Sequence, residues 1–222
     1  MTPPSFTLLS LELACRDDVF RARTWFEHAS TTTGEEIAVE WINEPARWTW
    51  NGSDLSVTTE PSTDFWRVTG ESVDALRDNG HLFGESVSGD FDVTVDVSGT
   101  FVAQYDQAGV MVRISDDQWF KTGVELLDGL PRFSTVVTFD VSNWMMTELP
   151  PTFGHLSIRL ASRGNAVEVF RSLDGGPEEF CAHLYVPPAE ERFVGVMCAA
   201  PKGAGFTAEF HNLVITPRTS SS

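Results

Sequence analysis

Short runs of alternating apolar and polar residues recur along this chain from about residue 37 onward. The clearest run covers residues 91–97, FDVTVDV, where every second residue is Phe or Val and the others are Asp or Thr. Successive side chains of a β-strand point to opposite faces, so such a run predicts a strand with one buried and one solvated face. No run with the period of an amphipathic helix occurs in this part of the chain. The pattern therefore predicts an all-β protein.

Turn-forming residues separate these runs at short intervals. Asn51 and Gly52 lie between runs at 47–50 and 54–59, and this dipeptide favours a tight hairpin turn. Many short strands with Gly-rich turns and no intervening helices are typical of two antiparallel sheets packed as a sandwich. Further strands are expected at residues 106–115, 117–126, 133–139, 155–160, 166–171, 193–198 and 206–215.

The 222 residues are enough for one all-β domain with a sizeable core, which we place at residues 38–216. Residues 1–37 are predicted to be an N-terminal extension, either partly helical or disordered, and residues 217–222 a disordered tail. The start of the chain resembles a signal peptide only faintly, because it lacks a basic region and Glu12 interrupts its apolar stretch. We therefore expect a cytoplasmic protein.

The charge balance restricts the partners. The chain has 32 acidic and 15 basic residues, which give a formal charge of −17. Such a surface repels phosphate groups, so neither nucleic acid nor an anionic membrane is expected as a partner. No apolar run approaches the roughly 18 residues that a membrane-spanning helix requires.

Three cysteines are too few, and odd in number, for a disulfide framework. If residues 185–186 pair with residues 193–194, Cys181 faces Cys198. Reduced thiols that pack as small apolar groups are nevertheless the expected state.

Two successive strands carry an unusual polar face. In the run 106–115 one face is apolar, and in the run 117–126 the inward face is formed by Phe120, Thr122, Val124 and Leu126. If the two runs pair, their other faces form one surface that mixes opposite charges, an amide, glycines and a tryptophan. A merely solvated face does not require that mixture, so we expect the functional site here. This surface carries Gln107, Gly109, Met111, Arg113, Trp119, Lys121, Gly123 and Glu125.

The chain resembles the DUF1349 family, also called the regulation of enolase protein 1-like family. The resemblance covers about residues 37–216 and rests on the tracts 63–66 (TDFW), 105–113 (YDQAGVMVR), 119–125 (WFKTGVE) and 134–138 (STVVT). One departure is the tract 142–144, where Asn143 stands at a position at which the family pattern has Asp. The departure weakens any role for an acid at that position.

The resemblance implies an antiparallel two-sheet jelly-roll sandwich of the concanavalin A-like lectin/glucanase type, with a polar concave sheet. That superfamily contains sugar binders and glycosidases, and the family name implies a link to the regulation of a glycolytic enzyme. A fold does not by itself imply a function.

The leading hypothesis is a non-catalytic binding domain for a carbohydrate or a small polar metabolite on the concave sheet. Sugars are bound by planar hydrogen-bonding groups together with an aromatic platform. The alternative is structural, with Arg113 and Glu125 as a buried ion pair and Trp119 in the core. A further alternative is a protein-interaction or regulatory module of carbon metabolism, with a protein partner. The candidate ligand-binding residues are Tyr105, Gln107, Arg113, Trp119, Lys121, Glu125, Trp144 and Arg159.

A glycoside hydrolase that uses Glu125 is the enzymatic alternative. A retaining glycosidase needs two carboxyl groups about 5–5.5 Å apart. Glu168 or Asp106 could approach Glu125 across the sheet, whereas the Glu-x-Asp-x-x-Glu tract of glucanases with this fold is absent from the sequence. We expect Lys121 or Arg113 to keep Glu125 ionised, which suits a nucleophile better than a general acid.

Neither a metal nor a cofactor is predicted. The histidines have no paired spacing, and the cysteines form no Cys-x-x-Cys motif, which makes zinc improbable. Asp140, Ser142 and Asn143 have the oxygen ligands that calcium prefers, but we expect them to form a solvated turn.

Overall fold

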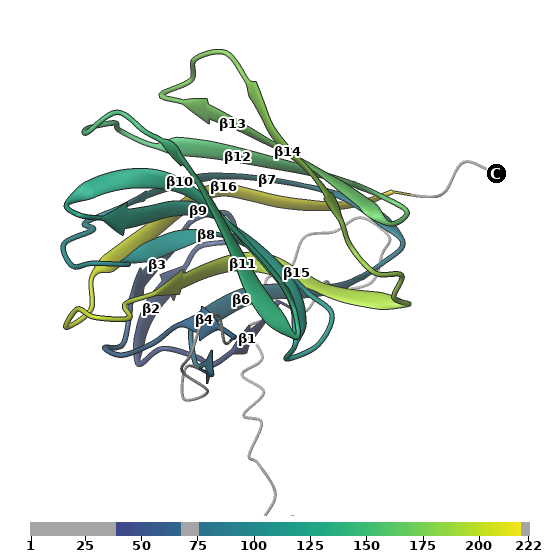
Figure 1. Ribbon diagram of the computed structural model, residues 1–222, viewed down its shortest axis with the longest axis horizontal. Helices are drawn as coiled ribbons and strands as arrows, with labels where there is room; N and C mark the ends of the chain where they lie inside the picture. Colours follow the sequence, from purple (N-terminus) through teal and green to yellow (C-terminus); the bar gives the residue numbers. More distant parts are fainter. Residues whose placement is uncertain (1–38, 68–75, 219–222) are drawn as a thin grey trace, which may run out of the picture. The chain divides into compact units, whose positions relative to one another are not determined.

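The computed structural model describes residues 39–67 and 76–218, and these residues form β-strands and no helix (Figure 1). The predicted N-terminal extension, residues 1–37, lies outside the described residues. The last strand continues through Arg218, two residues beyond the predicted end of the domain.

Two seven-stranded antiparallel sheets contain most of the described residues (Figure 1). The first sheet has the order β1-β6-β15-β8-β9-β10-β11, and the second has the order β14-β13-β12-β7-β16-β3-β2. A third, two-stranded sheet pairs β4 with β5. The strands are β1 (Glu40–Ile42), β2 (Arg47–Trp50), β3 (Leu55–Thr58), β4 (Phe65–Trp66), β5 (Arg77–Asp78), β6 (His81–Ser88), β7 (Asp90–Gly99), β8 (Gln107–Arg113), β9 (Gln118–Leu127), β10 (Leu130–Phe139), β11 (Val141–Glu148), β12 (Leu156–Arg163), β13 (Ala166–Leu173), β14 (Glu179–Tyr185), β15 (Glu191–Ala199) and β16 (Thr207–Arg218).

The apolar faces of the two large sheets form one core. In the second sheet, Val93 and Val95 of β7 pack with Ile158 of β12, and all three are at most 2% exposed. In the first sheet, Val110 and Phe120 contribute to the same cluster. Each fully buried side chain of this size contributes about 1.5–3 kcal/mol, so the alternating runs supply the main stabilisation of the sandwich. The predicted sandwich is confirmed.

The hairpin predicted at Asn51 and Gly52 is confirmed, with Gly52 at a φ of 105°. Residues 185–186 do not pair with residues 193–194, so the condition under which Cys181 would face Cys198 is not met. Strand β14 pairs with β13 in the second sheet, whereas β15 pairs with β6 and β8 in the first. Cys181 and Cys198 therefore lie in different sheets, and both are free thiols. Burial raises the pKa of the Cys198 thiol, as expected for a cysteine packed in the core.

Two pairs of facing glycines bring neighbouring strands of the first sheet unusually close. Gly84 lies opposite Gly195, and Gly109 lies opposite Gly123. A Cβ atom on Gly123 would lie 2.2 Å from the carbonyl oxygen of Ala108 and 2.5 Å from the Cα of Gly109. Because backbone atoms cannot yield to such a contact, only glycine fits these positions.

Strand β11 is an edge strand and exposes several apolar side chains. Val141 is 46% exposed and Met145 is 48% exposed. The start of the strand is fixed to the chain after β4, because the N–H of Ser142 donates to the carbonyl oxygen of Arg67 at 2.8 Å. The backbone N–H of Arg67 donates in return to the hydroxyl of Ser142 at 2.9 Å.

One acidic side chain points between the two sheets. Glu85 lies opposite Val194 and on the same face of β6 as Phe83 and Val87. Val194, Phe83 and Val87 all belong to the core. Glu85 is 6% exposed and has no hydrogen-bond or ion-pair partner among the residues that the structure describes. Burial raises its pKa, because the charged form loses its hydration.

Substitution of Gly123 by Ala is expected to lower the free energy of unfolding by about 2–3 kcal/mol, because the new methyl group meets backbone rather than a movable side chain. Chemical denaturation of the purified variant measures this change. The control is Gly129→Asn, since Gly129 has a φ of 74° that Asn tolerates and no atom within 4 Å of its Cβ position. Equal stability of Gly123→Ala and wild type would contradict the close approach.

Substitution of Glu85 by Gln is expected to stabilise the fold at mildly alkaline pH. The folded state of the wild type binds the Glu85 proton more tightly than the unfolded state does, since the folded pKa is raised above 4.5. Wild-type stability is therefore lost as the pH rises through the folded pKa, and the variant escapes this loss. Urea unfolding at several pH values should show the advantage of the variant shrinking as the pH falls. An advantage independent of pH would exclude titration of Glu85 as its cause.

Candidate functional site

The predicted alternation of faces in β8 and β9 is confirmed. Ala108, Val110, Val112, Phe120 and Val124 belong to the core. Thr122 lies on the same face as a buried polar residue. The odd-numbered residues lie on the outer face of the first sheet, where Gln107 pairs with Glu125. The same register places Met111 opposite Lys121.

The outer face is covered at its centre, whereas a ligand site on the concave sheet requires that face to be open to solvent. The segment with β4 covers it, since Phe65 packs against Met111, Trp119 and Met197 in a second apolar cluster. The remaining cavity is about 10 Å³, which is about the room that one water molecule needs. The predicted site residues beneath are buried, with exposed fractions of 5% for Gln107, 3% for Trp119, 4% for Lys121 and 6% for Glu125.

Lys121 uses its ammonium group to hold β4 on the sheet. It donates to the carbonyl oxygen of Phe65 at 2.7 Å, to Oε1 of Gln107 at 2.5 Å and to Oδ1 of Asp64 at 3.3 Å. A lysine has three donors, and these three acceptors match them. Nε2 of Gln107 also donates to Oδ1 of Asp64, at 3.2 Å. Lys121, Gln107 and Asp64 therefore form one buried polar cluster.

The structural alternative placed Arg113 and Glu125 in a buried ion pair, but the two side chains do not pair. Its guanidinium makes two hydrogen bonds to Asp78 of β5, at 2.5 and 2.8 Å. Arg113 lies at the opposite end of β8 from the residue that faces Glu125, so the sheet register separates the two side chains. Arg113 thus holds β5 as Lys121 holds β4.

Glu125 interacts with the edge strand instead. Nε1 of Trp144 donates to Oε2 of Glu125 at 3.1 Å and to Oγ of Ser134 at 3.0 Å. Burial raises the pKa of Glu125, and the nearby charge of Lys121 opposes this rise only in part. Lys121 thus favours the charged form of Glu125, as expected, but desolvation is the larger effect and the net direction of the pKa is upward.

Three aromatic side chains border the buried polar cluster, and we call Trp66, Tyr105 and Trp144 the aromatic rim. The ring centroids of Trp66 and Trp144 are 6.0 Å apart at an interplanar angle of 83°. Those of Tyr105 and Trp144 are 6.0 Å apart at 72°. Trp144 is 36% exposed. Tyr105 has a φ of 70°, an unfavourable backbone conformation for a bulky residue that is often found at functional sites.

One residue of the aromatic rim and one of the buried polar cluster were not predicted from the sequence. Tyr105 and Trp144 were predicted, whereas Trp66 and Asp64 were not assigned to the site. Both missed residues lie in the tract 63–66 that carries part of the family resemblance. That tract was the available signal, but a two-residue strand has no alternation to show which side chains face the sheet.

Arg159 lies on the second sheet, not beside the other predicted residues. It belongs to β12 and pairs with Thr94 of β7 on the outer face of that sheet. Its side chain lies on the face opposite to that of Ile158, which belongs to the core. Alternation predicts the face of a strand but not the sheet to which the strand belongs.

The two carboxyl groups considered as partners for Glu125 lie elsewhere. Glu168 is in β13 of the second sheet. Asp106 accepts hydrogen bonds from the backbone N–H groups of Val102 and Ala103, at 2.9 and 2.8 Å. Asp64 is the carboxyl that acts on Glu125, since its negative charge contributes to the raised pKa.

The described part of the chain contains no group of three or more His, Cys, Asp or Glu residues that could hold a metal ion. It also contains no helix that is long and apolar enough to cross a membrane.

Comparison with known proteins identifies relatives over most of the chain. The yeast protein named "Regulation of enolase protein 1", from Saccharomyces cerevisiae, is 29% identical over 176 residues, which are 79% of this chain and 88% of that protein. A crystal structure of a functionally unknown protein from Saccharomyces cerevisiae has a TM-score of 0.76 at 28% identity and covers 82% of this chain and 97% of its own.

More distant structures share the fold alone. The GH43 protein BlXynB from Bacillus licheniformis has a TM-score of 0.63 at 12% identity, and the match covers 81% of this chain but 37% of that protein. The Bacteroides ovatus protein GH43B of a xyloglucan locus gives the same TM-score at 15% identity, over 86% of this chain and 40% of its own.

The model of the family described as "Protein of unknown function (DUF1349)" matches residues 41–218. The chain therefore belongs to the DUF1349 family, and its described residues form the antiparallel two-sheet jelly-roll sandwich that the resemblance implied.

Proposed function

We propose that this protein is a non-catalytic, intracellular binding domain that holds a carbohydrate or another small polar metabolite against the aromatic rim. The observation that carries the proposal is the orientation of Trp144. Its indole is partly exposed, yet its N–H is fixed by hydrogen bonds to Glu125 and Ser134. An aromatic platform that is already ordered loses little conformational freedom when a ligand binds.

The chemistry of the aromatic rim suits a sugar. The C–H faces of a sugar ring pack on an aromatic surface, while its hydroxyl groups need acceptors and donors nearby. Trp144 provides the apolar surface, and Tyr105 adds a phenolic hydroxyl at its edge. The formal charge of −17 disfavours anionic ligands, so a neutral ligand fits better than a phosphorylated one.

The buried polar residues take a supporting role in this proposal. Lys121 donates to the carbonyl oxygen of Phe65 in β4, and Gln107 donates to Asp64, which precedes β4. Arg113 donates to Asp78 in β5. They hold the segments that border the aromatic rim, and Trp119 packs beneath Phe65. Seven of the eight predicted ligand-binding residues thus belong to one structural unit, of which Tyr105 and Trp144 are the ligand-facing members.

Hydrolysis by Glu125 is a less well supported alternative. A raised pKa suits a general acid, and Asp64 provides a second carboxyl close by. A sugar ring does not fit into about 10 Å³, however, so the glycosidic bond would not reach these groups. The name of the yeast relative favours a third alternative, a regulatory module of carbon metabolism that binds a protein partner.

A thermal-shift screen with neutral sugars, polyols and phosphorylated metabolites tests the proposal. A ligand at 100 times its Kd should stabilise the wild type by about 2.7 kcal/mol. Trp144→Ala should weaken binding about tenfold or more, since it removes the platform. Met145→Ala is the matched control, because Met145 is exposed on the same strand but belongs to the other face.

A stabilising sugar that binds Trp144→Ala as tightly as the wild type would contradict the proposed site. Release of a reducing sugar during incubation would favour the hydrolase instead, and a protein partner that co-purifies without any sugar response would favour the regulatory module.

Substitution of Lys121 by Met is expected to lower the free energy of unfolding by about 3 kcal/mol, because Asp64, Gln107 and the Phe65 carbonyl lose their shared donor. Urea denaturation measures the loss. Lys202→Met, which removes the other lysine, is the control, since no hydrogen bond or ion pair of Lys202 is present in the described structure. A stable Lys121→Met variant that loses sugar binding would instead show a direct role of Lys121 in ligand binding.

A further inference from the structure

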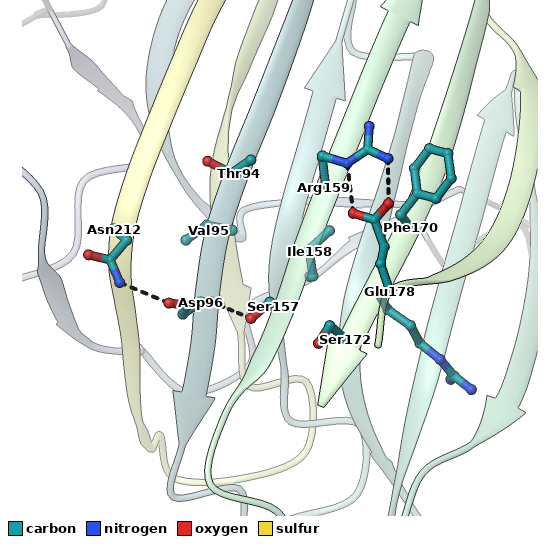
Figure 2. Close-up of a pocket in the computed structure, with 11 residues that line it drawn as sticks. Thr94, Val95, Asp96, Ser157, Ile158, Arg159, Phe170, Ser172, Glu178 and Asn212 are labelled. Atoms are coloured by element: carbon teal, nitrogen blue, oxygen red, sulfur yellow. Dashed lines mark hydrogen bonds and ion pairs between the residues drawn. The ribbon is translucent and has the colours of Figure 1, made fainter. Parts of the chain in front are cut away.

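A groove lies on the outer face of the second sheet, away from the aromatic rim (Figure 2). It has a volume of about 290 Å³ and crosses β16, β7, β12 and β13. This volume is close to the lower end of the range for small-molecule sites, which begins at about 300 Å³. The side chains on which the inference rests are Thr94, Asp96, Ser157, Arg159, Phe170 and Asn212.

One side of the groove is a hydrogen-bonded carboxylate. The hydroxyl of Ser157 donates to Oδ1 of Asp96 at 2.5 Å, and Nδ2 of Asn212 donates to Oδ2 at 2.8 Å (Figure 2). Burial alone would raise the pKa of Asp96, but these hydrogen bonds, together with the nearby charges of His155 and His211, lower it. A carboxylate oxygen can accept two hydrogen bonds and each oxygen of Asp96 here accepts one, so Asp96 keeps acceptor capacity.

The other side of the groove is an ordered guanidinium. Arg159 lies over the ring of Phe170, with its Cζ 3.8 Å from the ring centroid. Its Nε and Nη2 donate to the two carboxylate oxygens of Glu178, at 2.7 and 2.6 Å. Nη1 of Arg159 has no hydrogen-bond partner among the described residues, so it remains an available donor. Glu178 offsets the charge of Arg159 and fixes its direction.

Irregular strand pairing places a side chain on each side of the groove. The pairing of β16 with β7 shifts register between His211 and Val214, and Asn212 in that bulge has a φ of 55°. The pairing of β13 with β14 shifts register beside Phe170. Bulges redirect side chains and occur next to functional sites more often than elsewhere. A plain solvated sheet face needs neither irregularity, which distinguishes this groove from the rest of the outer face.

We propose that this groove is a second binding site, which takes a neutral polyhydroxylated molecule such as a mono- or disaccharide. Hydroxyl groups of the ligand donate to Asp96 and to Oδ1 of Asn212, and one hydroxyl accepts from Nη1 of Arg159. A molecule with hydroxyls on adjacent carbons supplies donors and acceptors in the alternation that these side chains need. The inference is independent of the aromatic rim, since the two sites lie on different sheets.

The ligand class follows from charge as well as from hydrogen bonding. Both arginines that line the groove are already offset by carboxylates, Arg159 by Glu178 and Arg171 by Glu179, so neither is left as an unpaired cation for an anionic ligand. The formal charge of −17 opposes anions further. An organic cation would leave Nη1 of Arg159 without an acceptor.

Titration of the isotope-labelled full chain with D-glucose, D-xylose and cellobiose, followed by NMR, tests this inference. Saturable shifts are expected at the side-chain amide of Asn212 and at the backbone amides of residues 94–96 and 157–159. Asp96→Asn and Arg159→Lys are each expected to weaken this binding about tenfold, because each removes one charge-assisted or geometrically matched hydrogen bond. Arg163→Lys is the matched control, since Arg163 forms an ion pair with Asp92 on the same sheet outside the groove.

Two further comparisons separate this inference from the aromatic rim. Trp144→Ala should leave the shifts at Asn212 unchanged, and D-glucuronate should bind the groove more weakly than glucose. The inference is overturned if no sugar of the set produces saturable shifts at the groove, or if Arg163→Lys weakens binding as much as Arg159→Lys. It is also overturned if glucuronate binds more tightly than glucose. Shifts confined to the aromatic rim would overturn the groove site and support the proposed function. Shifts confined to the groove would support the groove site and contradict the proposed function.

Discussion

The close approach of strands at the facing glycines is the constraint on which the outer face of the first sheet depends. Gly109 and Gly123 carry no Cβ atoms, and the residues beside them in the sheet, Met111 and Met197, have flexible side chains. The centre of this face therefore has little side-chain bulk, and its methionines can adjust to the ring of Phe65, which packs against them. Because β4 and β5 cover this face, their polar groups lose contact with water and need partners. Lys121 donates to the carbonyl oxygen of Phe65, and Arg113 pairs with the carboxylate of Asp78.

Alternation in the sequence predicted the strands and their faces because burial in a sandwich repeats every two residues. It worked best for long strands such as β7 and β9, which contact neighbours on both sides. It did not predict β11, an edge strand whose side chains are mostly exposed and whose pattern is therefore weakly constrained. Nor could it assign Arg159 to a sheet, because strand order depends on long-range pairing that no local pattern records.

The sequence predicted that Gln107, Lys121 and Glu125 share one face, but not that β4 covers this face. The mixture of Lys121, Gln107 and Glu125 on one face was a sound sign of a specialised surface, but buried polar groups serve structure as readily as binding. The covering strands β4 and β5 have two residues each, too few for any periodic signal. The groove of the second sheet depends on two bulges. A bulge interrupts the two-residue alternation from which strands are predicted, so the sequence pattern did not predict the groove.

The position of Trp144 on an edge strand has a consequence for motion. Strand β11 is bonded to the sheet along one side, and its start is fastened by the two hydrogen bonds between Ser142 and Arg67. Edge segments with much exposed surface open by local fluctuations that cost far less than global unfolding. When that margin of the sheet frays, the indole and the carboxyl of Glu125 separate, and hydration of the carboxyl then lowers its pKa toward the ordinary value. The proton affinity of Glu125 is in this way coupled to the opening of β11.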